Sequence, residues 1–375
     1  MQPTHDKCGM RKQDLRIWLG IAAVILVYAL LVVPVVQGLT TPDSISLTPA
    51  EYAAIAENSD TTTGDSDGDT KYITVKLFNL FPIKKVQVNL LPFDHVLVGG
   101  LPIGFCGEID GVLVTADGEL RQGDVIHAVD GVAVNNLTTY QAAIAGKSRV
   151  QLTLTRNGKT IAKTLDPTAL VDLRDTTTGV GILTFINPDN QTFSALGHQM
   201  TDFDTGAALD LAGGTVRSVN TYGIVKTQGH QTGVIQSSIT NTPSQGSITN
   251  GNAYGIRGCL RPDSPLLTQA TTTLPVATRY HVKPGAATLR TSLDGETVEE
   301  FSCEILKTRW QTGRQEKSMV IRVTDPRLLQ QTGGIVHGMS GSPIIQDNHL
   351  VGVLTHAITH DPAKGYALYI DFVNI

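Results

Sequence analysis

Short runs in which apolar and polar residues alternate dominate the chain from residue 73 onward. Residues 73–78 and 86–91 carry apolar side chains at nearly every second position, which is the period of a strand with one buried face. Similar runs, separated by Gly, Asn and Asp turns, continue to the C-terminus. The pattern therefore predicts a mainly β fold.

One pair of runs predicts a β-hairpin. Residues 150–156 and 159–165 both alternate, and they flank the dipeptide Asn157-Gly158. Asn and Gly tolerate the positive φ angles of the tight turn that joins two antiparallel strands. Just before this hairpin, residues 138–145 predict a helix with Thr138 as its N-cap.

The N-terminal region contains an uncharged apolar segment. Residues 17–36 read IWLGIAAVILVYALLVVPVV, which is long enough to cross a bilayer core of about 30 Å. The preceding basic residues are Lys7, Arg11, Lys12 and Arg16. The positive-inside rule then predicts a cytosolic N-terminus at 1–16 and an extracytoplasmic remainder. The segment exceeds an ordinary signal-peptide core and no A-x-A motif follows it, which favours a retained signal anchor over a cleaved one.

Composition divides the rest of the chain. Residues 40–72 are rich in Thr, Ser, Asp and Ala and predict a linker. The composition changes again at Asp166-Pro167, directly after the predicted hairpin. We therefore predict a linker with leading strands at 37–85, a first domain at 86–166 and a second domain at 167–375, which has the length of a double β-barrel.

The bulk composition is that of a globular protein. Of 375 residues, 41% are hydrophobic and 17% are charged, and the net charge of −5 argues against a nucleic-acid partner. The 4 cysteines are Cys8, Cys106, Cys259 and Cys303, of which only the first precedes the apolar segment. A disulfide between Cys259 and Cys303 is one possibility. The number of cysteines beyond the apolar segment is odd, however, which favours small buried thiols over a disulfide framework.

A glycine-rich stretch of the first domain resembles the peptide-binding loop of PDZ domains. The stretch GGLPIGF occupies 99–105, and GDVI at 123–126 and VDGV at 129–132 extend the resemblance. In PDZ domains the backbone N–H groups of this loop bind a peptide carboxylate, and the next strand pairs with the peptide. The resemblance implies a PDZ-like domain at 86–166. Its peptide-binding residues would be Gly100, Leu101, Ile103, Gly104 and Phe105.

The motif GMSGSP at 338–343 carries the strongest chemical signal. A serine nucleophile needs an exposed Oγ on a tight turn and two backbone N–H groups for the oxyanion, and small residues permit such a turn. The motif resembles the GDSGGP of chymotrypsin-like peptidases. This implies that Ser340 is the nucleophile and that the amides of Gly338 and Ser340 form the oxyanion hole. Ser342 is the alternative nucleophile, although it aligns with a glycine.

The residues after this motif predict a second hairpin. Ile344 and Ile345 begin a strand, Asp347-Asn348 makes a turn, and residues 350–356 return. In chymotrypsin-like folds such a hairpin follows the nucleophile.

The sequence signals for the general base and its orienting carboxylate are less specific than the signal for the nucleophile. His198 follows an apolar strand that ends in Gly197, as the catalytic His does in chymotrypsin-like folds. Asp325 ends a strand before Ser340 and is the candidate that would hold the imidazole. Asp202 and Asp204 are local alternatives, close to His198 in the sequence.

Longer stretches resemble one family in particular. ALGHQMTDFDTG at 195–206 and the run from RVTDP to ALYI at 322–370 are similar to stage IV sporulation protein B, a family of serine peptidases of spore-forming Firmicutes. The order of anchor, PDZ-like domain and peptidase agrees. The resemblance implies a chymotrypsin-like double β-barrel at 167–375 and a triad of His198, Asp325 and Ser340. Acyl transfer by such a triad needs no cofactor and no metal.

The same resemblance implies a biological role. The enzyme would act in the space between mother cell and forespore, held at the membrane by residues 17–36. There it would cleave the regulatory subunit of a membrane-embedded protease, which triggers processing of the sigma-K precursor. It would also cleave its own chain, with the PDZ-like domain governing timing and substrate capture.

Other functions are weighed against this one. A non-catalytic, membrane-anchored PDZ scaffold with a decayed peptidase domain is the main alternative, and the presence of His198, Asp325 and Ser340 argues against it. A heat-shock peptidase of the trimeric type would have its PDZ domain after the protease. His356 and His360 lack the Glu of HExxH and lie in a strand-like run, and no P-loop is present.

Overall fold

The computed structural model describes residues 42–58, 71–77, 81–169, 172–270, 272–311 and 313–373. Contacts divide the chain into two compact units, Met1–Leu90 and Leu91–Ile375. Within the described ranges, no helix has the length and apolar character needed to cross a membrane. The segment predicted to do so, residues 17–36, lies outside those ranges.

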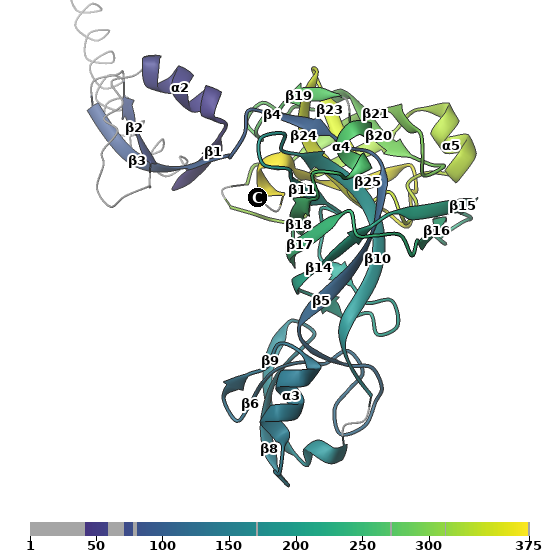
Figure 1. Cartoon of the computed structure of the whole chain (residues 1–375). Helices are drawn as coiled ribbons and strands as arrows, with labels where there is room; N and C mark the ends of the chain where they lie inside the picture. Colours follow the sequence, from purple (N-terminus) through teal and green to yellow (C-terminus); the bar gives the residue numbers. More distant parts are fainter. Residues whose placement is uncertain are drawn as a thin grey trace, which may run out of the picture. The chain divides into compact units, whose positions relative to one another are not determined.

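The N-terminal unit is a small sheet with one helix (Figure 1, purple and blue). Strand β3 (Phe81–Leu90) lies in the middle, parallel to β1 (Ser44–Leu47) and antiparallel to β2 (Lys71–Leu77). Leu47, Ile73 and Val88 form its core. The two leading strands expected from the alternation therefore exist and pair with each other.

The predicted linker at 40–72 is wrong for the part that forms β1 and helix α2 (Pro49–Asn58). The N–H of Thr48 donates to the Glu51 carboxylate at 2.8 Å, and the N–H of Glu51 donates to the Thr48 hydroxyl at 3.2 Å. This reciprocal capping box satisfies two N–H groups at the helix start, and Pro49 follows at the position that favours proline.

Six strands of the second unit close into a first barrel. The ring runs through neighbouring strands in the order β5, β10, β11, β18, β17, β14 and back to β5. These are β5 (Pro102–Val114), β10 (Leu173–Ile186), β11 (Thr192–Ala195), β14 (Leu211–Arg217), β17 (Gly246–Asn252) and β18 (Gly255–Leu260). Two outer strands extend this sheet from β10: β4 (His95–Val98) and β19 (Thr273–Pro275).

The predicted peptide-binding loop is part of this barrel. Strand β5 pairs with β10 on one side and with β14 on the other, so its backbone offers no free edge to a peptide. Gly100 precedes the strand and Gly104 lies within it. The side chains of Leu101, Ile103 and Phe105 are buried in the barrel core. The assignment of these five residues to peptide binding is therefore corrected to a packing role.

The end of β5 and the start of β10 enter a small module inserted into the first barrel (Figure 1). We call it the insert module; it contains β6 (Val125–Val129), β7 (Val132–Ala133), helix α3 (Leu137–Ile144), β8 (Val150–Arg156) and β9 (Lys159–Leu165). It has its own core, which includes Val112, Ile126 and Leu152. The boundary expected at 166–167 therefore falls between this module and β10, inside one compact unit.

Two local predictions are confirmed in the insert module. β8 and β9 form the expected hairpin, and Asn157 and Gly158 have φ of 49° and 73° at its turn. The predicted helix exists as α3, but Asn136 rather than Thr138 is its N-cap. The side chain of Asn136 accepts the N–H of Thr139 at 2.8 Å, which satisfies a donor of the first turn.

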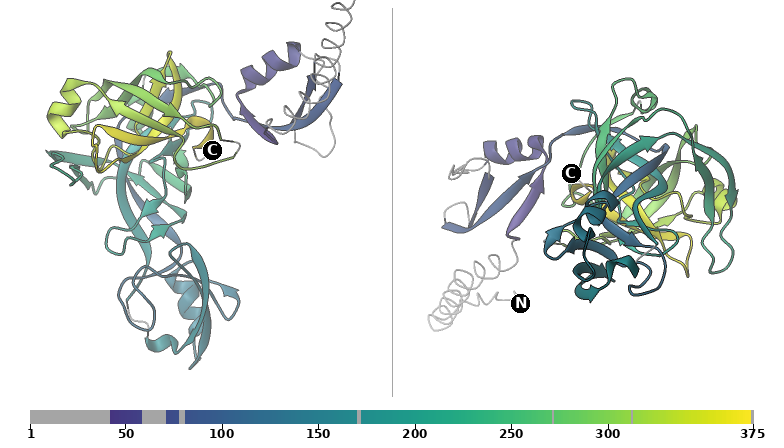
Figure 2. Two further views of the ribbon diagram at one scale, coloured as in Figure 1. Left: turned by 180° about the vertical axis from the view of Figure 1, so that it is seen from behind. Right: turned by 60° about the horizontal axis from the view of Figure 1, so that its bottom comes forward.

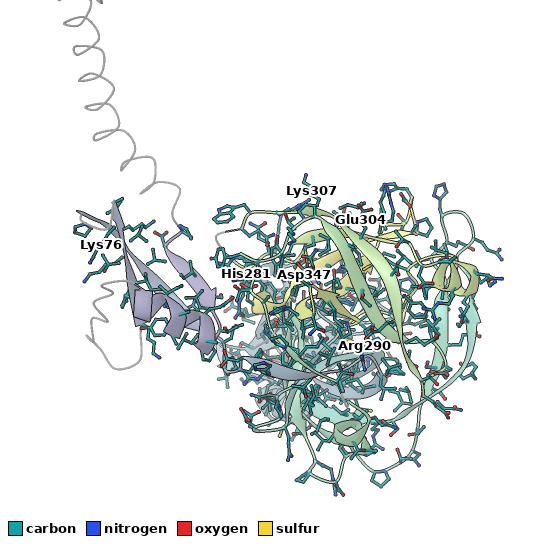
Figure 3. The ribbon with its side chains drawn as sticks, turned by 90° about the horizontal axis from the view of Figure 1, so that it is seen from above. Lys76, His281, Arg290, Glu304, Lys307 and Asp347 are labelled. Atoms are coloured by element: carbon teal, nitrogen blue, oxygen red, sulfur yellow. The ribbon has the colours of Figure 1, made fainter. Side chains whose placement is uncertain are left out.

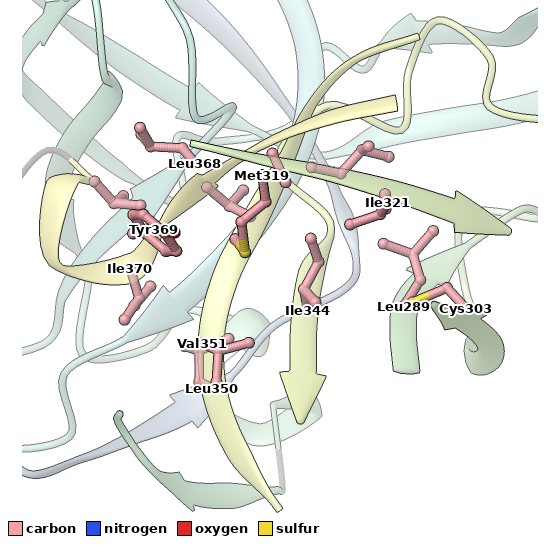
Figure 4. Packing of buried hydrophobic residues seen from close by; sticks show 14 of the residues in the cluster. Leu289, Cys303, Met319, Ile321, Ile344, Leu350, Val351, Leu368, Tyr369 and Ile370 are labelled. Atoms are coloured by element: carbon pink, nitrogen blue, oxygen red, sulfur yellow. The ribbon is translucent and has the colours of Figure 1, made fainter. Parts of the chain in front are cut away.

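Six further strands close into a second barrel, drawn in green to yellow and grouped together in both views of Figure 2. In ring order they are β20 (Gly285–Ser292), β21 (Val298–Thr308), β22 (Met319–Val323), β25 (Lys364–Tyr369), β24 (His349–Ala357) and β23 (Pro343–Gln346). Leu289, Met319 and Leu368 are among the buried residues that fill it (Figure 4). The charged side chains of Arg290 on β20 and of Glu304 and Lys307 on β21 are labelled in Figure 3.

The second unit contains further elements outside the two barrels and the insert module. They are η1 (Pro167–Ala169), β12 (Met200–Thr201), β13 (Ala208–Leu209), β15 (Val219–Val225), β16 (Val234–Ile239), α4 (Pro265–Gln269), α5 (Pro326–Thr332) and η2 (Ile370–Phe372). The hairpin expected after the nucleophile motif is confirmed as β23 and β24, with Asp347 and Asn348 at positive φ in its turn.

The cysteines beyond the apolar segment are free thiols. Cys106 and Cys259 lie in the first barrel, whereas Cys303 lies on β21 in the core of the second. The bridge considered between Cys259 and Cys303 is absent from this structure. Burial raises the pKa of the Cys303 thiol to about 12, which keeps it protonated and inert.

Candidate active site

The GMSGSP motif forms a tight turn between α5 and β23. Gly338 and Gly341 both have φ of 99°, a conformation that side chains rarely adopt. A Cβ atom on Gly341 would lie 2.2 Å from the carbonyl oxygen of Ile182, so the first barrel approaches the backbone of the turn directly. The N–H of Ile182 donates to the carbonyl oxygen of Ser340 at 2.8 Å. The turn therefore lies where the two barrels meet.

The two serines of the motif have different surroundings. Ser342 is 0% exposed, and its hydroxyl donates to the Met339 carbonyl oxygen at 2.6 Å inside the turn. Ser340 is partly exposed, and its hydroxyl donates to the carbonyl oxygen of Thr355 on β24 at 2.9 Å. Only Ser340 can therefore meet a substrate without unfolding the turn.

The backbone amides of the turn also fall into two groups. Those of Met339, Gly341 and Ser342 donate to carbonyl oxygens of Val336, Leu354 and Met339. Among the residues that the structure describes, the amides of Gly338 and Ser340 have no such acceptor. These are the two amides that the sequence motif assigns to an oxyanion hole.

His198 follows a sharp turn at the end of β11. Leu196 and Gly197 have φ of 71° and 72°, and a Cβ atom on Gly197 would lie 2.9 Å from a methyl group of Val353 on β24. The glycine therefore allows His198 to approach the second barrel. The Nδ1 atom of His198 is 2.7 Å from the carbonyl oxygen of Gln199.

Strand β24 brings the serine and the histidine together. Thr355 accepts the hydroxyl of Ser340, and the next residue, His356, has its ring centroid 4.7 Å from that of His198. Gly181 of the first barrel lies next to both Leu196 and Ser340. A Cβ atom on Gly181 would be 2.8 Å from the Leu196 side chain and 3.4 Å from the Ser340 carbonyl oxygen, so Leu196, two residues before His198, also lies beside the turn. His198 and Ser340 therefore both lie beside β24.

Asp325 is not brought to His198. Its carboxylate caps α5 by accepting the N–H of Arg327 at 2.9 Å, and it also accepts the N–H of Ser302 at 3.2 Å. The Arg327 guanidinium completes its contacts at 3.0 Å and holds the pKa of Asp325 below its usual value. The structure thus gives this carboxylate a capping role and leaves the Gln199 carbonyl as the group that orients His198.

The local alternatives, Asp202 and Asp204, are also engaged elsewhere. Asp202 is buried and accepts hydrogen bonds from Arg174 and Thr205, and Asp204 forms an ion pair with Arg174 at 3.1 Å. Their contacts stabilise the turn between β12 and β13. Neither carboxylate reaches the imidazole.

The surroundings of His198 favour its neutral form. Loss of hydration is the main cause and lowers its pKa from 6.5 to about 4. Positive charge on His356 and His337 contributes to this lowering of the pKa, whereas the Gln199 carbonyl and Glu316 oppose it. A neutral imidazole at physiological pH is the form that a general base requires.

Three contributors to this site were missed in the sequence: Gln199, Thr355 and His356. Gln199 and Thr355 act through backbone carbonyl oxygens, which leave no signature in a sequence. His356 was considered only as part of a metal motif with His360. Within the described ranges, no group of three or more His, Cys, Asp or Glu side chains is arranged to hold a metal ion.

The mainly β fold with two six-stranded barrels is consistent with a chymotrypsin-like architecture. A family model described as SpoIVB peptidase S55 matches residues 170–373. The chain therefore belongs to the SpoIVB peptidase S55 family and is a serine peptidase of sporulation, which hydrolyses peptide bonds. The comparison with curated proteins gives no match.

Proposed function

We propose that Ser340 is the nucleophile of this peptidase and His198 its general base. The observation that carries the proposal is that both side chains contact β24. The Ser340 hydroxyl donates to the Thr355 carbonyl oxygen, and the His198 ring lies against the His356 ring. The rival Ser342 is buried and hydrogen-bonded inside the turn. The orientation of His198 supports the same roles.

The contact with Gln199 determines the tautomer of the base. A carbonyl oxygen only accepts hydrogen bonds, so Nδ1 of His198 must carry a proton and donate it. In the neutral ring this leaves the lone pair of Nε2 free to accept a proton. In chymotrypsin-like catalysis Nε2 is the atom that takes the proton of the serine.

These roles give the proposed course of acyl transfer. The Ser340 hydroxyl turns from the Thr355 carbonyl toward Nε2 of His198, and Oγ attacks the substrate carbonyl as its proton passes to Nε2. The amides of Gly338 and Ser340 stabilise the oxyanion, and His198 returns the proton to the leaving amine. In the second half of the reaction His198 takes a proton from a water molecule, whose oxygen attacks the acyl carbon; the bond to Ser340 Oγ then breaks and His198 returns the proton to Oγ.

A fluorophosphonate probe tests the nucleophile, because it labels only an activated serine. With the full-length chain, we expect labelling of the wild type and of Ser342→Ala, provided that this matched variant folds. Ser340→Ala should abolish labelling and His198→Ala should slow it strongly. Labelling that survives in folded Ser340→Ala would overturn the assignment, and a folded wild type that resists the probe would favour the non-catalytic scaffold.

The proposed cellular role rests on the family. The substrate is the regulatory subunit of a membrane-embedded protease, and its cleavage triggers processing of the sigma-K precursor between mother cell and forespore. Residues 17–36 hold the enzyme at the membrane, with the barrels on the extracytoplasmic side, and the chain also cleaves itself. In sporulating cells, Ser340→Ala should leave the sigma-K precursor unprocessed and the chain uncut, whereas normal processing in that strain would exclude this role.

Of the PDZ-like domain predicted at 86–166, the insert module is the part for which we keep that proposal. Its GDVI and VDGV segments lie in β6 and at the turn to β7, and α3 follows them as the helix does in the resemblance. Its role would be to govern substrate capture and self-cleavage. The loop at 99–105 has no part in this proposal, because it belongs to the barrel.

A further inference from the structure

His356 is a histidine of the site to which the reaction above gives no role. It lies near the end of β24 and directly follows Thr355, which holds the Ser340 hydroxyl. Its ring centroid is 4.7 Å from that of His198, and the two ring planes are inclined by 38°. One face of His356 thus covers His198 while the residue remains exposed.

The charged and titratable groups around this pair come from three elements. His356 lies on β24, and His337 precedes the nucleophile turn. Glu316 and Lys317 lie between β21 and β22. Lys317 also lies 4.7 Å from the ring centre of Tyr366 on β25, which places its ammonium group on this side of the second barrel.

We propose that His356 is a positioning residue for His198, holding its ring by direct contact and opposing its protonation when His356 is itself charged. The inference rests on the proposed role of His198 as general base. The contact limits rotation of the His198 ring about its side-chain torsions, so that Nδ1 stays on the Gln199 carbonyl and Nε2 stays available for Ser340. One strand thereby positions both reacting side chains.

The charge effect follows from the ring separation. Two positive charges at this distance repel each other, so a charged His356 makes proton uptake by His198 less favourable. The loss of hydration, and after it the charge of Lys317, in turn lower the pKa of His356, which favours its neutral form near physiological pH. At that pH the two neutral rings are in contact without charge repulsion. Because His356 is neutral, it does not oppose the imidazolium that forms on His198 during catalysis.

Two substitutions separate the ring contact from the charge. His356→Phe keeps an aromatic ring but cannot be protonated, so kcat at neutral pH should stay within about twofold of the wild type. His356→Ala removes the ring, and we expect kcat to fall about tenfold with little change in KM, because the base is less well oriented. His349→Phe is the matched control at the other end of β24 and should change neither parameter.

A titration of His198 in the full-length chain supplies the second readout. With ¹³C-labelled histidine in a Ser340→Ala background, His356→Phe should raise the pKa of His198 by about one unit, since the repelling charge is gone. His349→Phe should leave it unchanged. This measurement needs no turnover and remains decisive if His356→Ala does not fold.

The inference is overturned if folded His356→Ala turns over like the wild type, or if the pKa of His198 is the same with and without His356. Failure of the proposed function has a different signature, namely activity that persists in His198→Ala or Ser340→Ala. Loss of activity in those two variants with wild-type behaviour in the His356 variants rejects only the positioning role.

Discussion

Asp325 is held by contacts that have no direct connection to His198. The residue begins α5, its carboxylate accepts the N–H of Arg327, and Pro326 occupies the first helical position. An acidic N-cap followed by proline is a typical helix start. The carboxylate accepts a free N–H group of the first turn, and proline lacks an N–H group at a position where it would have no partner in the helix. The dipeptide Asp325-Pro326 therefore carried a capping signal in the sequence, although its place before Ser340 suggested catalysis.

Substitution of Asp325 separates these two roles. Asp325→Asn keeps a good capping side chain, so we expect kcat/KM of the folded enzyme to stay within a few-fold of the wild type. Asp325→Ala loses the cap and should lower the free energy of unfolding by about 1 kcal/mol. Urea unfolding and peptide hydrolysis measure both. A fall of about 10⁴-fold in Asp325→Asn, as expected for a triad carboxylate, would show that Asp325 acts on His198 after all.

The depressed pKa of His198 predicts the pH dependence of the enzyme. A general base works only in its neutral form, so activity is lost as the pH falls through the pKa of the imidazole. That pKa is about 4, and the pKa of His356 is also lowered from 6.5. The acid limb of kcat/KM should therefore lie clearly below pH 6.5. A limb at that value would indicate a well-hydrated base, and circular dichroism controls for acid unfolding.

At the scale of elements, the nucleophile turn depends on glycine for two separate reasons. Gly341 has φ of 99°, and the space where its Cβ would lie is taken by the Ile182 carbonyl. An alanine must therefore both strain the backbone and push the barrels apart. The turn and its approach to the first barrel are thus one feature.

We expect Gly341→Ala to lower the free energy of unfolding by about 2 kcal/mol or more and to abolish fluorophosphonate labelling. Gly118→Ala is the control, since no atom lies within 4 Å of the position of its Cβ. Thermal unfolding and labelling of both variants check this. A stable, fully labelled Gly341→Ala would mean that the turn adapts without moving the nucleophile.

Elements with local signals were predicted well. The hairpins β8–β9 and β23–β24 follow from alternation around Asn157-Gly158 and Asp347-Asn348, because the turn residues and the strands are neighbours in the sequence. Helix α2 was taken for a linker, although the capping box of Thr48 and Glu51 marks its start. The polar composition around it outweighed that signal.

At the scale of the catalytic unit, hydrogen bonds between the barrels hold the site. The buried hydroxyl of Thr184 on β10 donates to the Gly341 carbonyl at 2.8 Å, next to the bond between Ile182 and Ser340. Strand β10 of the first barrel therefore fixes the nucleophile turn of the second. A nearly isosteric substitution can test this link.

Thr184→Val should lower the free energy of unfolding by about 1–3 kcal/mol, since it leaves a buried carbonyl without its donor, and it should reduce kcat. Thr291→Val is the matched control. Thr291 is also buried, but its hydroxyl has no partner among the described residues, so its loss should be neutral or stabilising. Equal effects of the two variants would contradict the proposed link between the barrels.

The sequence by itself determined the mainly β character, the local hairpins, the nucleophile motif and the family, because each of these depends on residues that are near one another along the chain. Only the tertiary structure decided which strands close each barrel. Strand β5 alternates like any other, but Ile103 and Phe105 pack in the first barrel while Val112 packs in the insert module. Likewise, the carbonyl groups of Gln199 and Thr355 act through the backbone, and only the folded chain brings them to His198 and Ser340.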